Sequence, residues 1–121
     1  MPENSNSDRS NERHLSPAWA KQQLPGDQGE AYRLLFEHGS LEVEVYSPQG
    51  TDPQQPHNRD EVYVIISGNG WFVNGGARSR FQPGDLLFVP AGVVHRFEDF
   101  SADFATWVLF YGPEGGEAGG G

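Results

Sequence analysis

Apolar and polar residues alternate in several short stretches of the chain, which is the pattern of β-strands with one buried face. The clearest stretch is Leu41–Tyr46, in which Leu and Val alternate with Glu. Residues 62–66 are apolar on both faces, so this strand is expected to lie between two layers. Further strands are predicted over residues 71–73, 86–89, 93–100 and 104–111.

Turn-forming residues separate these strands at short intervals, as in Ser67-Gly68-Asn69-Gly70 and Pro90-Ala91-Gly92. Many short strands with regular turns indicate an all-β sandwich or barrel. No helix-length repeat interrupts them, which argues against a parallel α/β sheet. One short helix is predicted over residues 16–24, with Ser16 as its N-cap and Pro25-Gly26 beyond its end. The alternative for that stretch is an irregular lead-in.

A length of 121 residues fits one domain. The expected division is an N-terminal segment 1–30 that contains the helix, a barrel over 31–112 and a Gly-rich tail over 113–121. Residues 1–14 and 113–121 bury too little apolar surface to offset the entropy of ordering them, so we expect disordered tails that can be removed. A core this small gains stability by pairing, and the strand that is apolar on both faces predicts a homodimer.

The net charge and the absence of cysteine limit the partners and the metal ligands that this chain can have. A net charge of −9 argues against nucleic acid and against an anionic membrane surface as partners. No apolar run approaches the roughly 20 residues of a membrane span, and no signal-peptide pattern is present, so we expect a cytoplasmic protein. Without Cys, any metal ion must be held by nitrogen and oxygen donors. A small molecule is then the expected partner.

Two stretches supply such donors. In Gln55–Glu61, a straight strand would place His57 and Glu61 roughly 13 Å apart, too far for a shared ion. Asn58, Arg59 and Asp60 are suited to a tight turn that returns Glu61 to the side of His57. Gln55 lies two residues before His57 and would share its face of the incoming strand.

The second stretch is the strand that follows Pro90-Ala91-Gly92. Its residues Val93, His95, Phe97 and Asp99 share one face, so His95 lies between apolar neighbours on a face that is expected to point inward. Together with His57 and Glu61, it would complete a mixed nitrogen and oxygen donor set. Such a set suits Zn, Fe, Mn or Ni, which the sequence does not distinguish.

These stretches resemble the two motifs of the cupin superfamily, in its small single-domain form. Glu61-x6-Gly68 is similar to the end of the first motif, and Gly84-x5-Pro90-x-Gly92-x2-His95 is similar to the second. The resemblance implies a jelly-roll barrel, a double-stranded β-helix, that holds one divalent metal ion. It implies His57, Glu61 and His95 as ligands and places Gln55 where the family usually has its first His. Asp99 replaces the usual closing Asn.

Three functions remain open at this point. The first is a metalloenzyme of the dioxygenase, isomerase or lyase type that acts on a small organic substrate, with Tyr63 as a candidate proton donor. The second is a non-catalytic module that binds a sugar or an organic acid. The third is a metal-free enzyme similar to sugar epimerases.

Overall fold

The computed structural model describes residues 13–118, which form one short helix and eight strands. The helix is α2 (Pro17–Gln22). The strands are β1 (Tyr32–His38), β2 (Leu41–Tyr46), β3 (Asp60–Ser67), β4 (Gly70–Asn74), β5 (Ala77–Phe81), β6 (Leu86–Val89), β7 (His95–Glu98) and β8 (Ala105–Tyr111).

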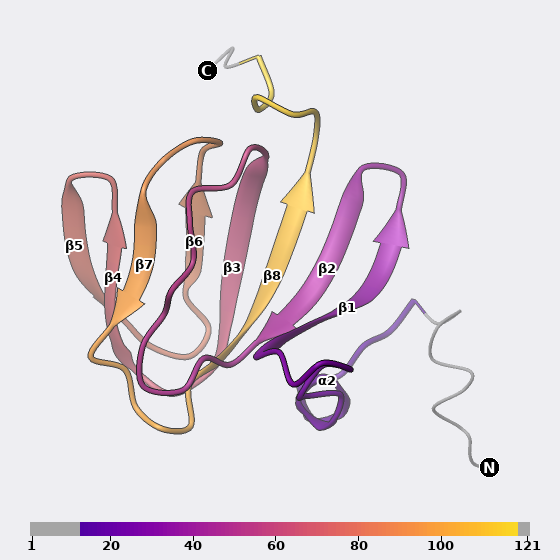
Figure 1. The fold of residues 1–121 in the computed structure, drawn as a ribbon, viewed down its shortest axis with the longest axis vertical. Helices are drawn as coiled ribbons and strands as arrows, with labels where there is room; N and C mark the ends of the chain where they lie inside the picture. Colours follow the sequence, from indigo (N-terminus) through magenta and orange to yellow (C-terminus); the bar gives the residue numbers. More distant parts are fainter. Residues whose placement is uncertain (1–12, 119–121) are drawn as a thin grey trace.

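The strands form two sheets, one with five strands in the order β1-β2-β8-β3-β6 and one with three in the order β5-β4-β7. All their pairings are antiparallel. Figure 1 shows the smaller sheet on the left and the larger sheet extending to the right of it. The all-β prediction is therefore confirmed.

Strand β3 lies between β8 and β6 in the larger sheet, and its inner face packs against the smaller sheet. Glu61, Tyr63 and Ile65 point inward and are buried, whereas the alternate residues between them are partly exposed on the outer face. The outer face is continued on β6 by Leu86 and Phe88, which are 64% and 45% exposed. The inner face of β3 is therefore covered by the smaller sheet. In a single chain, the apolar residues of its outer face stay partly exposed, so β3 is not covered on both faces as predicted.

Aromatic rings fill the space between the sheets. Phe97 lies at the centre of this cluster, with ring centroids 4.7 Å from Phe72, 4.9 Å from Tyr63 and 4.6 Å from Phe104. Offset and edge-on contacts at such distances are the favoured arrangements of aromatic side chains. The packed rings hold β3, β4 and β7 in fixed positions, and the polar residues described below lie at the starts of β3 and β7.

The predicted helix is present but ends two residues earlier, at Gln22. Ser16 caps it, since its Oγ accepts a hydrogen bond from the backbone N–H of Trp19 at 3.1 Å. The fully buried residue of the helix is Ala20, whereas Trp19 is only partly buried. Arg33 on β1 donates to the carbonyl of Gln23 at 3.4 Å and so ties the helix to the larger sheet. Within residues 13–118, no helix has the length and apolar character needed to cross a membrane.

We predicted disordered tails over residues 1–14 and 113–121. Of these, residues 1–12 and 119–121 lie outside the described residues, whereas residues 113–118 are described. In that part, the N–H of Gly115 donates to the carbonyl of Asn58 at 2.6 Å. The N–H of Glu117 donates to a carboxylate oxygen of Asp60 at 2.9 Å. Residues 113–118 therefore contact the turn before β3 through backbone hydrogen bonds, which a reading of apolar content alone does not anticipate.

Candidate metal centre

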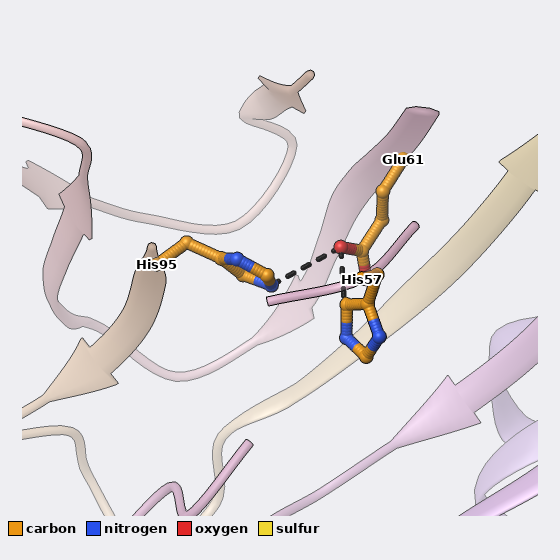
Figure 2. Close-up of side chains that lie close together, drawn as sticks. All are labelled: His57, Glu61 and His95. Atoms are coloured by element: carbon orange, nitrogen blue, oxygen red, sulfur yellow. Dashed lines mark ion pairs between the residues drawn. The ribbon is translucent and has the colours of Figure 1, made fainter. Parts of the chain in front are cut away.

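Two histidines and one glutamate meet at one end of the barrel. Glu61 is the second residue of β3 and His95 is the first residue of β7, while His57 lies in the loop before β3. Their potential ligand atoms all lie within 4.8 Å of one another. Figure 2 shows both imidazole rings approaching the same carboxylate of Glu61. The sequence predicted these three residues as a group, and the structure brings them together.

The approach of His57 to Glu61 depends on the predicted turn. The chain bends at Asn58 and Arg59, and the Nε2 atom of His57 comes to 3.9 Å from Oε1 of Glu61. The carbonyl of His57 accepts a hydrogen bond of 2.7 Å from the N–H of Gly92, in the turn before β7. This bond links the loop that carries His57 to the turn that leads to His95.

Glu61 and His95 face each other in the buried interior. Oε1 of Glu61 and Nε2 of His95 lie 3.1 Å apart and form an ion pair when the imidazole is protonated; when it is neutral, neither atom has a hydrogen-bond partner among residues 13–118, and both side chains are almost fully buried. Nδ1 of His95 lies 2.9 Å from the carbonyl of Val93, which only accepts, so Nδ1 carries the proton and Nε2 presents a lone pair. A gap of 3.1 Å fits a proton on the line that joins the two atoms, whereas a metal ion held by both, with bonds of about 2.0–2.2 Å, would lie to one side of that line.

The pKa values of the two imidazoles are shifted in opposite directions. Burial lowers the pKa of His57, which keeps this ring neutral, as a metal ligand has to be. At His95, burial acts to lower the pKa, but the Glu61 carboxylate and the Val93 carbonyl outweigh it, so the pKa of His95 is raised. A proton on His95 and a metal ion would therefore compete for the same nitrogen.

The structure places Gln54, and not Gln55, beside the cluster. Oε1 of Gln54 lies 3.1 Å from Nε2 of His57, whereas the side chain of Gln55 is exposed. The prediction for Gln55 assumed a regular strand, but residues 51–57 form none. Pro53 and Pro56 lack the N–H groups that a strand needs, so the two-residue alternation does not apply here. These two prolines are the sequence signal that argued against a strand.

Asp52 fixes the direction of the Gln54 amide. One carboxylate oxygen of Asp52 accepts hydrogen bonds from Nε2 of Gln54 at 2.7 Å and from the backbone N–H of Phe97 at 2.8 Å. The other oxygen accepts from the hydroxyl of Tyr46. Because a carboxylate accepts and does not donate, the amide nitrogen has to face Asp52, and the amide oxygen then faces His57. Asp52 is a residue that the sequence analysis did not single out.

Tyr63 lies behind the candidate donor shell, by which we mean Gln54, His57, Glu61 and His95. Its hydroxyl donates to Oε1 of Gln54 at 3.0 Å, and its side chain has no exposed surface. Burial raises the pKa of Tyr63 well above its ordinary value, so the phenol stays protonated. In this position, Tyr63 orients Gln54, and it is not among the residues that line the cavity described next.

A cavity of about 790 Å³ opens beside the cluster. It is large enough for a small organic molecule. Among the residues that line it are Gln54, His57 and Glu61 from the donor shell, Glu44 and Tyr46 from β2, and Phe110 from β8. A bound molecule in this cavity would therefore be in direct contact with the donor shell.

Comparison with known proteins settles the family. The family model for the cupin domain matches residues 42–111, which include His57, Glu61 and His95. The chain belongs to the cupin family. This finding confirms the resemblance that the two sequence motifs indicated.

This cupin is similar in sequence to two proteins and in fold to a third, as follows. It is 35% identical over 86 residues to an uncharacterized protein, SCO3923, of Streptomyces coelicolor, a match that covers 69% of this chain and 82% of that protein. It is 34% identical over 70 residues to the dimethylsulfoniopropionate lyase DddQ of Ruegeria pomeroyi, which covers 56% of this chain but only 35% of the lyase. The crystal structure of the conserved protein SPY1581 of Streptococcus pyogenes, of unknown function, matches the fold with a TM-score of 0.61 and 21% identity, over 86% of this chain and 93% of that one.

Proposed function

We propose that this cupin binds one divalent transition-metal ion through His57, Glu61 and His95, with the amide oxygen of Gln54 as a fourth donor. The observation that carries the proposal is the convergence of His57, Glu61 and His95, whose potential ligand atoms lie within 4.8 Å of one another, with Glu61 and His95 buried. With His95 neutral, the facing atoms of Glu61 and His95 lack a partner, and a buried polar atom without a partner costs about 1–3 kcal/mol. An ion bound by both atoms would remove that cost and would compete with a proton for Nε2 of His95.

The spacing of the donors supports the same conclusion. Metal–ligand bonds of about 2.0–2.2 Å place neighbouring donors about 3.0–3.5 Å apart in octahedral or tetrahedral geometry. The 3.1 Å between Glu61 and His95 lies in this range, and so does the hydrogen-bonded contact of 3.1 Å between His57 and Gln54. His57 and Glu61 are 3.9 Å apart and would have to move closer together around an ion. Imidazole, carboxylate and amide donors favour Zn, Fe, Mn or Ni.

We further propose that the bound ion serves an enzymatic reaction on a small organic substrate that enters the 790 Å³ cavity. When bound, a divalent ion supplies Lewis acidity toward a substrate oxygen or a water molecule. In this chain, Gln54 and His57 would border both the ion and the substrate, and Asp52 would keep the Gln54 amide in one orientation. A lyase, an isomerase or an oxygenase reaction is consistent with such a site, and one of the relatives is a lyase.

Metal analysis of untagged protein tests the first proposal. The expected result is close to one equivalent of metal per chain, which is lost after treatment with a chelator and regained on reconstitution. His95→Ala should abolish uptake, whereas His38→Ala should retain it because His38 is exposed at the end of β1, away from the cluster. Well under one equivalent in the wild-type protein after reconstitution would contradict the proposal.

Catalysis needs a separate test. The metal-loaded protein is incubated with a panel of small dicarbonyl, phenolic and sugar substrates, under air and anaerobically. Turnover that disappears in His95→Ala supports an enzyme. Full metal loading without turnover of any substrate supports the alternative of a non-catalytic binding module, and turnover that survives complete metal removal supports the metal-free enzyme.

A further inference from the structure

The walls of the cavity carry negative charge beyond the donor shell. Besides Glu61, two carboxylates line it, Glu44 and Glu30, and no Lys or Arg is among the lining residues within the described chain. Two nearby arginines are paired with carboxylates that do not line the cavity, whereas Lys21 lines an adjoining pocket that shares Glu30. Arg33 lies 3.2 Å from Asp27, and Arg59 lies 3.3 Å from Glu42.

Glu44 is the more informative of the two wall carboxylates. It lies opposite Val108 in the sheet, and Val108 lies opposite Tyr63, so Glu44 shares the inner face of the barrel with Tyr63. Its side chain is half-buried and has no hydrogen bond or ion pair to any of residues 13–118. The charges that influence it, Glu42 and Glu61, have the same sign. An unpaired carboxylate in such a place costs free energy, which a cationic ligand group would recover.

The position of Glu44 relative to the donor shell defines the ligand it would complement. One strand, β8, separates β2 from β3, and the residues opposite Glu44 and Glu61 are two positions apart along it. With strand spacings of about 4.8 Å and a rise of about 3.4 Å per residue, the two Cα atoms are about 12 Å apart. Both side chains point into the cavity, so a small molecule can touch the donor shell with one end and Glu44 with the other.

We infer that the cavity selects small ligands that present oxygen donors to the metal ion at one end and a positively charged group to Glu44 at the other. The inference rests on the proposed metal site. His57 and Glu61 line the same cavity and mark where the donor end sits. A ligand with a negative group at its far end would meet the unpaired carboxylate of Glu44 and would be disfavoured.

Three catechols of similar size provide the test, because they share the metal-binding end and differ only in the charge of the other end. Dopamine carries an ammonium group, dihydrocaffeate carries a carboxylate, and ethylcatechol is neutral. Their affinities for the zinc-loaded protein are measured by calorimetry under anaerobic conditions at pH 8. We expect dopamine to bind at least about tenfold more tightly than dihydrocaffeate, with ethylcatechol between them.

Substitutions then assign the preference to one side chain. In Glu44→Gln, the affinities for dopamine and dihydrocaffeate should come within about threefold of each other, and in Glu44→Lys, dihydrocaffeate should bind the more tightly. Glu37→Gln is the matched control, because Glu37 is an exposed carboxylate of β1 that does not line the cavity. It should retain the wild-type preference.

The outcomes separate this inference from the proposal beneath it. If zinc binds and the three catechols bind equally, or none binds, the inference is overturned and the metal site stands. A preference for dopamine that persists in Glu44→Gln also overturns the role of Glu44. Metal analysis of each sample shows whether zinc is present, and a wild-type protein that takes up no zinc removes both the metal site and the inference.

Discussion

Replacing Glu44 with Gln should stabilise the metal-free protein at pH 8, because it removes an unpaired charge from a half-buried position. Burial, together with the like charges of Glu42 and Glu61, raises the pKa of Glu44 from 4.5 to about 7. A carboxyl group whose pKa is higher in the folded state than in the unfolded state binds its proton more tightly when folded. Its ionisation therefore weakens the fold as the pH rises from below 4.5 to above 7.

The size of the effect follows from the two pKa values. A difference from 4.5 to about 7 corresponds to about 3.4 kcal/mol at pH 8, at about 1.36 kcal/mol for each tenfold change in acidity. Glu44 is partly exposed, and water screens its charge, so we reduce the expected gain for Glu44→Gln to about 1–2 kcal/mol. At pH 5, only about a quarter of this gain should remain, since the folded protein is then protonated at Glu44 and the unfolded chain is ionised only in part.

Urea unfolding at pH 8 and at pH 5, with a chelator present throughout, measures both quantities. Glu37→Gln serves as the control, because Glu37 is an exposed carboxylate of β1 that does not line the cavity. Equal stability of Glu44→Gln and the wild type at pH 8, or a gain of the same size at both pH values, would refute the assignment of an unpaired, destabilising charge to Glu44.

Three further predictions concern other parts of the molecule. Gly68→Ala should destabilise the fold by about 2 kcal/mol or more, because Gly68 has φ of +85° and an added Cβ would lie 2.6 Å from the Cα of Phe104. In thermal melts, Gly76→Ala should change little, since an added Cβ there has no neighbour within 4 Å. Asp52→Asn should weaken zinc binding about tenfold in a competition titration, because an Asn amide can donate to Gln54 and permits its amide to turn over. Phe88→Glu should convert a dimer to a monomer in light scattering, since Phe88 is 45% exposed on the outer face of β6; a wild-type monomer at all concentrations would contradict the predicted homodimer.

The strands were predictable because alternation and turn residues are local signals. The stretch Leu41–Tyr46 is a strand with the predicted bounds. Alternation shows that a strand has two different faces, but it does not show which face lines a cavity. Here the side with Glu44 and Tyr46 faces the cavity, while Val45 on the other side is also fully buried. The polar face of this strand was therefore the functional one, and no local pattern distinguishes that case from a solvated face.

The donor shell was predictable where it lies on strands or follows a tight turn. His95 and Glu61 occupy regular strand positions, and the bend at Asn58 and Arg59 brings in His57 as expected. The choice between Gln54 and Gln55 depended on the conformation of a segment without periodicity. Its path is set by long-range hydrogen bonds, such as the one that the N–H of Phe97 donates to Asp52, which joins residues 45 positions apart in the chain.

Two of the four candidate donors lie in strands and two lie in a loop, and this difference affects which of them can be replaced without disturbing the fold. Glu61 and His95 are parts of strands, so an insertion or deletion near them would shift the sheet register and the aromatic core together. Gln54 and His57 lie on a segment outside the sheets, held by Asp52 and by the bond from Gly92. A lineage can exchange or lose donors on that segment, one residue at a time, while the barrel keeps its register. The two residues of the loop are therefore freer to change than the two strand residues while the fold is kept.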